Sequence, residues 1–495
     1  MDHVQGKNRN YPLNQSLEDL VTGDSFARII DAFVASIDLS TFDFKYFDLN
    51  EEGRPPYHPS VLLKLYLYGY QHGIRSSRKL AQACAVNLEV MWLLECQQPC
   101  FKTISDFRKN NKEAFREVFR SFVLLLREWK LIGGKTITVD SFKIRAQNSL
   151  KNNYNGAKIE RQQKYLLRKI AEYESALEAG EAEEAEIAEK IKDKQQKQEK
   201  YTRLAKELKR SEDGQLSTTD PDARAVVFQR NSVQVGYNIQ AASDAKHKLL
   251  VAMDTGDVND TKALSPMVVQ VQGNINKKQF RLLADKGYHN GRELKASEAL
   301  GVKTYVSPKA SSSSKAKTAY AMDKFKYNKR NDTYSCPAGE VLRTNGNWYN
   351  KKPVGGRKSY QVKHYKTKSC RECPLKAACT KSKNGRTIER SEYQEYITDN
   401  NKRVNNDLGF YRQRQQLIEH QFGTLKRQRG FDHTLLGGKD KVLAEVSLSF
   451  ICYNLSRTVS ILNFSTLLRR LKSHIAEKWS IFVTAGPRAC IANHF

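Results

Sequence analysis

The chain has 495 residues, and its 83 lysines and arginines outweigh its 54 aspartates and glutamates to give a formal charge of +29. This excess favours a polyanionic partner, namely nucleic acid, and predicts binding that weakens as the salt concentration rises. The length suggests about three or four domains. No run of about 18 apolar residues indicates a membrane span, and residues 1–10 lack the apolar core of a signal peptide, so we expect a cytosolic protein with no membrane partner.

Residues 1–130 are predicted to form an all-helical domain. Apolar residues recur at helical spacing after Asp24 and His58, and further helices are expected to begin near Gly73 and Thr103. Short helices with basic residues near their starts suit the grooves of DNA. We therefore expect this domain to bind double-stranded DNA through three arginines, Arg75, Arg78 and Arg108. The alternative is an ordinary helical bundle whose arginines are solvated.

Residues 131–155 are predicted to begin an α/β domain whose first strand ends at an acid. The apolar run that starts at Thr136 leads directly to Asp140.

From 156 to 212 the chain consists mostly of charged residues, Gln and Ala with spaced Leu, Ile and Tyr, interrupted at Gly180. This pattern predicts an inserted, coiled-coil-like helical hairpin. We interpret the hairpin as a solvated spacer or protein-contact arm that takes no part in the chemistry.

Residues 213–310 are predicted to continue the α/β domain. Strands are expected at 225–229, 233–242, 248–254, 280–284 and 302–306, with a helix near 261–271. The loop from Thr219 to Arg224 fits a substrate-facing loop and a capping turn almost equally well.

Several acids follow the strands of this region. Asp285 follows a clean buried strand, whereas Asp254, Asp257 and Asp260 follow a strand that ends in a turn-rich segment. Turns at strand ends collect aspartate for local capping reasons alone. We therefore prefer Asp285 as a site residue and keep the other three as alternatives.

Residues 311–395 are predicted to be a cysteine-rich insertion. Four of the nine cysteines lie there, at Cys336, Cys370, Cys373 and Cys379. Four cysteines with one C-x-x-C pair fit a tetrahedral, structural Zn²⁺ site in a small β-rich ribbon, with His364 as a substitute ligand. A metal would offset the scarcity of large apolar residues here. The alternative is a set of reduced thiols, since nine cysteines in so long a chain do not indicate a disulfide framework.

Glu419 is the one acid of a basic helical stretch within residues 396–465. Arg412, Glu419 and Lys426 recur every seven residues beside an apolar stripe. Such a helix buries one face and presents an acid together with cations on the next face.

The C-terminal part is predicted to be helical. Residues 443–459 form a strongly apolar segment that is expected to pack on the sheet. Within it, Asn454 fits either a helix cap or a residue at the edge of the site. Residues 466–495 are a tail that begins as a basic amphipathic segment.

Two strand-end aspartates and a helical glutamate, namely Asp140, Asp285 and Glu419, are the ligands that a pair of divalent cations requires. In phosphodiester chemistry the attacking and leaving oxygens both gain negative charge, and two Mg²⁺ ions stabilise them. Mg²⁺ takes hard oxygen ligands and keeps several waters, so a few carboxylates suffice. We expect Mn²⁺ to substitute for Mg²⁺.

The order of predicted elements is that of a ribonuclease-H-like fold. This is an α/β architecture with a mixed sheet flanked by helices, to which the N-terminal helical domain, the helical hairpin and the cysteine-rich insertion are added. In such a fold the first strand lies beside the strand that precedes Asp285, so Asp140 and Asp285 meet. A helix packed across the sheet then brings Glu419 to them.

The chain resembles the DDE transposases of bacterial insertion sequences, in the group with an N-terminal helical domain and a coiled insertion after the first strand. The resemblance covers most of residues 12–465. Its motifs share their order with the family and begin at Gly73 (Gly-Ile-Arg-Ser-Ser-Arg-Lys-Leu), Thr103 (Thr-Ile-Ser-Asp-Phe-Arg-Lys), Val139 (Val-Asp), Thr219 (Thr-Asp-Pro-Asp-Ala-Arg), Val235 (Val-Gly-Tyr-Asn-Ile-Gln), Ala284 (Ala-Asp-Lys-Gly-Tyr), Ile418 (Ile-Glu-His-Gln-Phe-Gly) and Tyr453 (Tyr-Asn-Leu-Ser-Arg).

The resemblance implies that the three acids are a metal-binding catalytic triad, and that Tyr411, an arginine and Lys426 hold the DNA end. In many relatives this arginine lies four residues before the glutamate, whereas here Arg414 lies five and Arg412 seven residues before it. Either arginine is therefore a candidate for the role.

The expected activity is transposition: binding of terminal inverted repeats, metal-dependent DNA cleavage and strand transfer, by a nucleoid-associated dimer or higher multimer. Two alternatives remain open. One is a DDE nuclease that cuts without joining, and the other is a non-catalytic DNA-binding derivative of a transposase.

Overall fold

The computed structural model describes residues 15–47, 55–179, 184–211, 213–228, 231–308, 318–352 and 359–485. Residues 1–10, the predicted break at Gly180 and residues 486–495 of the predicted tail lie outside the described part. Within that part, no helix has both the length and the apolarity that crossing a bilayer requires.

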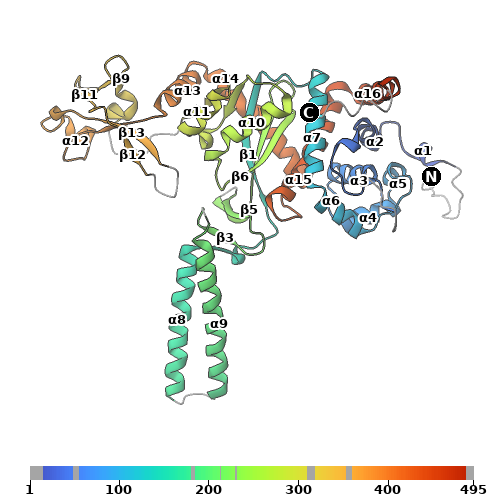
Figure 1. Cartoon of the computed structure of the whole chain (residues 1–495), viewed down its shortest axis with the longest axis horizontal. Helices are drawn as coiled ribbons and strands as arrows, with labels where there is room; N and C mark the ends of the chain where they lie inside the picture. The colour runs from blue at the N-terminus through green and yellow to red at the C-terminus, as the bar shows by residue number, and fades with distance from the viewer. Residues whose placement is uncertain are drawn as a thin grey trace, which may run out of the picture.

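A mixed six-stranded sheet lies at the centre of the molecule (Figure 1). Its strands are β1 (Thr136–Arg145), β4 (Arg224–Val227), β5 (Val233–Asp244), β6 (Leu250–Gly256), β7 (Arg281–Ala284) and β8 (Lys303–Val306). The order is β4-β5-β1-β7-β8, and β6 also pairs with β5. β5 is antiparallel to β1 and β6, whereas β7 is parallel to β1 and β8. This arrangement is that of a ribonuclease-H-like fold, so the predicted α/β class is confirmed.

Helices pack around the sheet. They are α10 (Leu264–Ile275), α11 (Gly291–Ala299), α13 (Gln394–Asn406), α14 (Leu408–Gly423) and α15 (Lys439–Leu462). α14 contacts β1, β5 and β7, and α15 contacts β6. The sheet is therefore covered. This explains why the first four residues of β1, two threonines and two apolar residues, are all buried.

Two buried asparagines bind outer strands of the sheet with both amide atoms. Asn454 of α15 accepts a hydrogen bond from Leu250 N at 2.9 Å and donates one to Leu250 O at 2.8 Å. Asn400 of α13 does the same with Val306, at 2.9 and 2.7 Å. Each amide thus takes the place of a further strand and satisfies backbone groups that would otherwise be orphaned. Asn454 is accordingly neither a helix cap nor a residue of the site edge.

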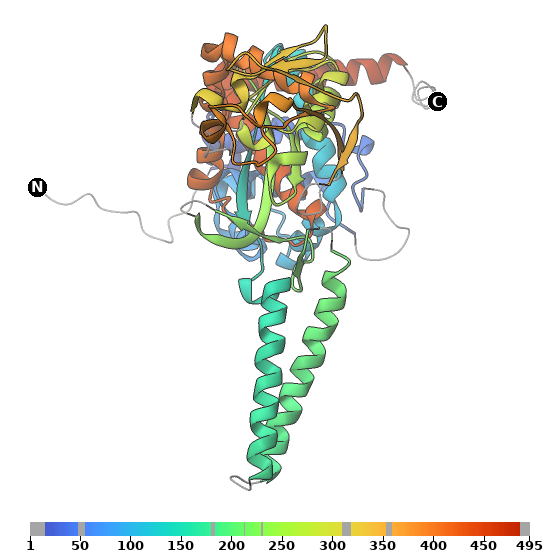
Figure 2. The same ribbon diagram turned by 90° about the vertical axis from the view of Figure 1, so that its left-hand side faces the viewer.

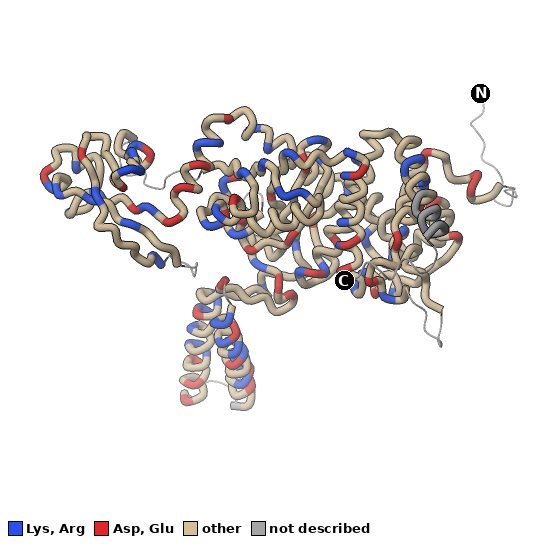
Figure 3. Tube along the Cα trace, turned by 45° about the horizontal axis from the view of Figure 1, so that its top comes forward, with Lys and Arg blue, Asp and Glu red and all other residues tan. Residues whose placement is uncertain are grey.

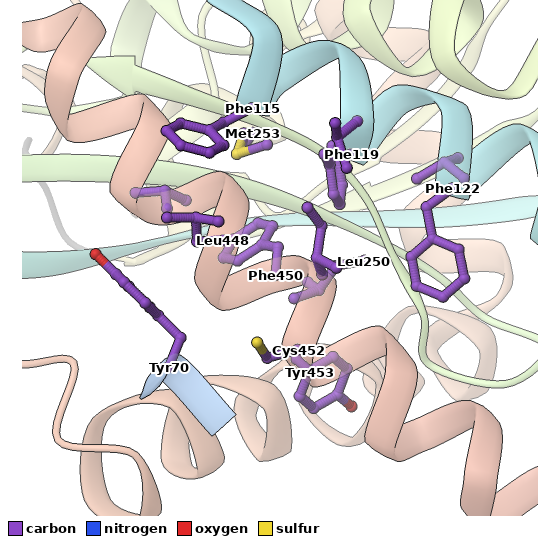
Figure 4. Packing of buried hydrophobic residues seen from close by; sticks show 14 of the residues in the cluster. Tyr70, Phe115, Phe119, Phe122, Leu250, Met253, Leu448, Phe450, Cys452 and Tyr453 are labelled. Atoms are coloured by element: carbon purple, nitrogen blue, oxygen red, sulfur yellow. The ribbon is translucent and has the colours of Figure 1, made fainter. Parts of the chain in front are cut away.

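The N-terminal part is all-helical, as predicted. Its helices are α1 (Leu17–Leu20), α2 (Phe26–Ser36), α3 (Pro59–Gln71), α4 (Ser77–Val86), α5 (Leu88–Leu93), α6 (Phe101–Asn110) and α7 (Lys112–Glu128), and α16 (Phe464–Ala485) packs against α2. α15 contacts α3 and α7 as well as β6 (Figure 4). Phe450 of α15 meets Phe119 of α7 at a ring-centroid distance of 6.0 Å and Phe142 of β1 at 6.5 Å. One continuous apolar core therefore joins the N-terminal helices to the sheet.

The predicted hairpin is present as two long helices, α8 (Gly156–Glu178) and α9 (Glu184–Leu208). It projects away from the rest of the molecule (Figures 1 and 2). Strands β2 (Asn153–Asn155) and β3 (Gln215–Ser217) pair at its base. Both signs of charge alternate along its length (Figure 3), with ion pairs such as Lys164 with Glu160 and Lys190 with Glu186. The hairpin is thus a solvated element with a small apolar cluster near its base.

The cysteine-rich insertion forms two small three-stranded sheets. Its strands are β9 (Lys326–Asn328), β10 (Thr333–Ser335), β11 (Val341–Arg343), β12 (Tyr349–Lys351), β13 (Tyr360–Tyr365) and β14 (Ile388–Ser391), and α12 (Lys376–Cys379) follows β13. The buried cluster between them is limited to Phe325, Tyr334, Leu342, Tyr365 and Ile388. So small a core agrees with the predicted need for an additional source of stability.

A buried network of charges joins the segment between α3 and α4 to the C-terminal part of the chain. Arg75 is 6% exposed, donates to His433 O at 2.6 Å and to Gly430 O at 3.0 Å, and lies 3.7 Å from Glu445, which is fully buried. The Glu445 carboxylate also accepts hydrogen bonds from Leu435 N and Leu436 N. Arg75 therefore compensates a charge that water cannot reach.

Replacing Arg75 by methionine leaves the Glu445 charge buried without its cation. We expect Arg75→Met to lower the free energy of unfolding by about 3 kcal/mol, measured by urea denaturation. Arg78→Met is the matched control because Arg78 is exposed and lies over the Phe101 ring at 5.3 Å, a contact worth at most about 1 kcal/mol. Equal losses in the two variants would contradict the assigned role of Arg75.

Candidate active site

The pairing of β1 with β7 brings two of the predicted acids together. Val139 of β1 is aligned with Ala284 of β7 in a parallel ladder. The residue after each of them is an acid, Asp140 within β1 and Asp285 directly after β7. The two carboxylates therefore start from neighbouring positions on adjacent strands. Asp285 is held further by its Oδ1, which accepts a hydrogen bond from Gly287 N at 2.8 Å.

Asp140 lies in a poorly solvated position against a cation. Burial raises the pKa of Asp140 to about 6; Arg414 and the Ser141 N–H oppose this, and the carboxylates of Asp285 and Asp260 add to it. Nη1 of Arg414 lies 2.7 Å from Oδ2 of Asp140, and the two side chains are 14% and 18% exposed. A carboxylate in such a place is stabilised by a positive partner, so this position suits a cation.

The structure distinguishes the two candidate arginines of the glutamate helix. Arg414 faces the acids, whereas Arg412 is exposed. Burial lowers the pKa of Arg414, but Asp140, Tyr411 and Asp285 outweigh this effect and raise it. Arg414 and Tyr411 therefore belong to the acidic centre, and Arg412 lies on the neighbouring surface.

Glu419 is carried by α14 between two residues that reach β1. Arg414 contacts Asp140, and Phe422 lies against Phe142 at a ring-centroid distance of 4.8 Å. The Glu419 side chain itself is exposed, and the contacts of the described residues include no hydrogen bond or ion pair of its carboxylate. Like Asp254 and Asp257, Glu419 is not among the charges that act on Asp140, so its place in the centre stays a prediction.

Lys426 lies beyond the end of α14, in a π-helical turn, η9 (Thr424–Gln428). Its Nζ is 5.7 Å from the centre of the Phe142 ring. Burial lowers the pKa of Lys426, and the neighbouring Lys143 lowers it further against the opposing effect of Asp432. Lys426 is therefore a partly buried cation at the same face of β1 as Asp140, as its spacing from Glu419 suggested.

Asp260, one of the acids set aside in favour of Asp285, also lies at this centre. It begins a short 3₁₀ helix, η4 (Asp260–Lys262), and its carboxylate accepts hydrogen bonds from Asn238 at 2.8 Å and Gln240 at 2.7 Å. Gln240 is fully buried and also binds the hydroxyl of the buried Tyr288. One feature of the sequence pointed to Asp260: it lies between a strand and a helix, a position that capping turns also occupy.

The other competing acids lie elsewhere. Asp254 accepts a hydrogen bond from Thr255 N at 2.8 Å, and Asp257 is exposed and 3.4 Å from Lys262. Neither is among the charges that act on Asp140.

The loop from Thr219 to Arg224 is bound to the start of α15. Asp220 accepts hydrogen bonds from Tyr237 and Gly438 N, and Asp222 accepts one from Lys439 N at 2.9 Å. These contacts favour the capping interpretation over a substrate-facing loop.

The prediction of direct DNA contact is wrong for two of the three arginines, Arg75 and Arg108, because both are buried. Arg75 is committed to Glu445 and to backbone carbonyls, and Arg108, which is 4% exposed, donates to Arg75 O at 3.0 Å. Both guanidinium groups are taken up by the protein interior. Arg78 is exposed and stays a candidate.

Asp140 and Asp285 fit a Mg²⁺ ion. Their donor set consists of two carboxylates on rigid elements, and the Arg414 guanidinium at Asp140 marks a place where positive charge is accommodated. In the described part of the chain, no three His, Cys, Asp or Glu side chains are arranged around one point as metal ligands. Mg²⁺ is nevertheless usually held by one or two carboxylates together with waters and substrate phosphates, so the pair is sufficient as a protein contribution.

Three cysteines of the insertion lie near enough to Cys379 to act on its thiol. Burial raises the pKa of the Cys379 thiol, Arg386 lowers it, and Cys370, Cys336 and Cys373 raise it further. Cys336 and Cys379 both pack on the small cluster of the insertion. His364 instead stacks on Tyr349 at 4.9 Å and lies 3.7 Å from Glu389. No disulfide links the eight cysteines of the described residues.

Two family models match the chain. One, described as "Transposase DDE domain", matches residues 335–459, and the other, "Transposase domain (DUF772)", matches residues 15–110. The first match includes Glu419 and the four cysteines, whereas Asp140 and Asp285 lie outside both matches. No curated protein matches the chain.

Among solved structures, a cryo-EM structure of the piggyBac transposase synaptic complex with hairpin DNA aligns over 94% of this chain and 83% of its own, at 9% identity and a TM-score of 0.34. A likeness at that level supports no conclusion about this chain. The two family matches indicate that the chain is a DDE-type transposase of an insertion-sequence type.

Proposed function

We propose that this transposase binds the terminal inverted repeats of its own element, cleaves DNA there and joins the freed end to target DNA. The observation that carries the proposal is the pair of carboxylates, Asp140 and Asp285, on adjacent strands beneath a helix that bears Glu419 and Arg414. The charge of +29 supports a nucleic-acid partner, since many phosphates must be neutralised.

The chemistry consists of two displacements at phosphorus. In the first, the oxygen of a water bonds to phosphorus, the bond to the 3′-oxygen breaks and that oxygen takes a proton to become a 3′-hydroxyl. In the second, the 3′-hydroxyl oxygen bonds to a phosphorus of target DNA, and the target 3′-oxygen leaves and takes a proton. In the first step a phosphodiester is hydrolysed, and in the second one phosphodiester replaces another. Neither step consumes an oxidant or an energy source.

Asp140, Asp285 and Glu419 would hold two Mg²⁺ ions, which Mn²⁺ can replace. When bound, these ions stabilise the negative charge that develops on the attacking and leaving oxygens. Asp140 and Asp285 supply ligands fixed by the sheet, and Glu419 supplies a ligand from the solvent side, where DNA approaches. Arg414 balances the charge of Asp140 before DNA binds and is positioned to contact a DNA phosphate afterwards.

The neighbouring cations would hold the DNA end. Tyr411 acts on Arg414 beside Asp140, and Lys426 lies over Phe142 of the strand that carries Asp140. Arg412 is exposed on the glutamate helix, and Arg78 is an exposed cation of the N-terminal helices. A dimer or higher multimer on DNA is proposed because two element ends must be held together during joining.

The reaction is tested with a DNA duplex taken from the flanks of the gene, a target plasmid and Mg²⁺ or Mn²⁺. We expect 3′-end cleavage and joining by the wild type and a loss of at least about 100-fold in Asp140→Asn and in Glu419→Gln, because each removes a ligand charge. Asp323→Asn is the control, since this acid is 72% exposed in the cysteine-rich insertion.

Each other result has a definite meaning. Cleavage without joined products would identify a DDE nuclease, and DNA binding without cleavage under either metal would identify a DNA-binding derivative. Cleavage that survives Glu419→Gln would show that the helical ligand is a different residue.

We also propose that Cys336, Cys370, Cys373 and Cys379 bind one structural Zn²⁺. Cys370, Cys336 and Cys373 act on the Cys379 thiol, and Cys336 and Cys379 pack on the small core. The four thiols do not surround one point in this structure, so zinc binding would draw them together. Thiolates are the ligands of closed structural zinc sites. His364 is not included because it lies with Tyr349 and Glu389.

Purified protein is expected to contain about one zinc per chain by elemental analysis, and Cys370→Ser with Cys373→Ser is expected to abolish it and to lower the melting temperature. Cys96→Ser is the control because Cys96 is exposed in the N-terminal part. Wild-type protein that is folded and free of zinc would contradict the proposal.

A further inference from the structure

The carboxylate of Asp260 uses only one of its two oxygens for the protein. Asn238 and Gln240 both donate to Oδ1. Among the contacts of the described residues, Oδ2 receives no hydrogen bond and Asp260 takes part in no ion pair. The side chain does not cap its own 3₁₀ helix either, since Asn259 performs that role. The free oxygen of Asp260 is thus unexplained by local structure.

Gly287 lies beside both this oxygen and Asp285. A Cβ atom at Gly287 would lie 2.9 Å from Oδ1 of Asp285 and 3.2 Å from Oδ2 of Asp260. The two carboxylate oxygens therefore both lie near the side of Gly287 on which a side chain would stand. Neighbouring carboxylates are suited to sharing one divalent cation.

A second buried atom beside Asp260 lacks a partner. Asn238 is 2% exposed, and its amide nitrogen donates to Asp260 and to Asp257 O. Its amide oxygen, Oδ1, is buried and has no hydrogen-bond partner among the described residues. A buried acceptor of this kind is costly unless it binds a donor such as a water, and waters are the usual remaining ligands of Mg²⁺.

We propose that Asp260 is a fourth acidic residue of the active centre and that its Oδ2 shares a divalent cation with Asp285. Gly287 is then required because a side chain there would crowd both carboxylates. Asn238 and Gln240 orient the carboxylate, and Asn238 Oδ1 accepts a hydrogen bond from a water of the ion. This inference rests on the proposed function, but it concerns metal binding and can be measured without DNA.

The test measures Mn²⁺ binding to the full chain. The free Mn²⁺ that remains is quantified by electron paramagnetic resonance. Asp260→Asn keeps an oxygen for the Asn238 and Gln240 hydrogen bonds and removes only the charge. We expect its Mn²⁺ affinity to fall by about 10-fold or more. Asp257→Asn is the matched control, since Asp257 is an exposed acid of the same loop, and its Mn²⁺ affinity should be unchanged.

Gly287→Ala provides a second variant that keeps every carboxylate and places a methyl group against the oxygens of Asp260 and Asp285. Its Mn²⁺ affinity is also expected to fall by about 10-fold or more. Unchanged affinity in either folded variant, or no Mn²⁺ binding by the wild type, would overturn the proposal.

The experiments can refute the proposed function and this inference separately. Wild-type protein that binds Mn²⁺ through Asp260 but never cleaves DNA would refute the function and leave the fourth acid standing. Wild-type protein that cleaves DNA and an Asp260→Asn variant that binds Mn²⁺ normally would refute only the fourth acid.

Discussion

The parallel pairing of β1 with β7 is the constraint on which the rest of the centre depends. It aligns Val139 with Ala284 and so places Asp140 and Asp285 at neighbouring positions. A slip of one residue would turn one of these side chains to the opposite face of the sheet. The register is fixed because the two buried faces of β1 differ: Ile137 and Val139 lie on one face and Thr138 on the other, so a slip would exchange apolar side chains with threonine. The apolar core therefore determines where the two charges lie.

The charges of the molecule are distributed between interior and surface for different purposes. Arg75 is buried and connects the N-terminal part to the segment that precedes α15, and the buried Arg108 binds the backbone of Arg75. Arg414 is partly buried against Asp140, where its charge offsets the cost of placing a carboxylate out of water. The formal charge of +29, which counts these three arginines as well, is what favours a DNA partner.

Sequence patterns predicted the sheet, the helical hairpin and the meeting of Asp140 with Asp285, because strand periodicity and strand-end acids are local signals. They did not separate Arg412 from Arg414, since helical spacing gives a face and not the contact that the face makes. Arg75 was wrongly taken for a surface residue because its partners, His433 and Glu445, are distant in sequence. Asp260 was interpreted as an ordinary turn residue because its hydrogen-bond donors, Asn238 and Gln240 of β5, cannot be identified from local sequence.

The most direct test of the central claim is the position of a bound divalent cation. Crystals of the protein soaked with Mn²⁺ and measured by anomalous diffraction are expected to show a peak between the carboxylates of Asp140 and Asp285. Ordered Mn²⁺ that is bound elsewhere, with no anomalous density between these two carboxylates, would contradict the account.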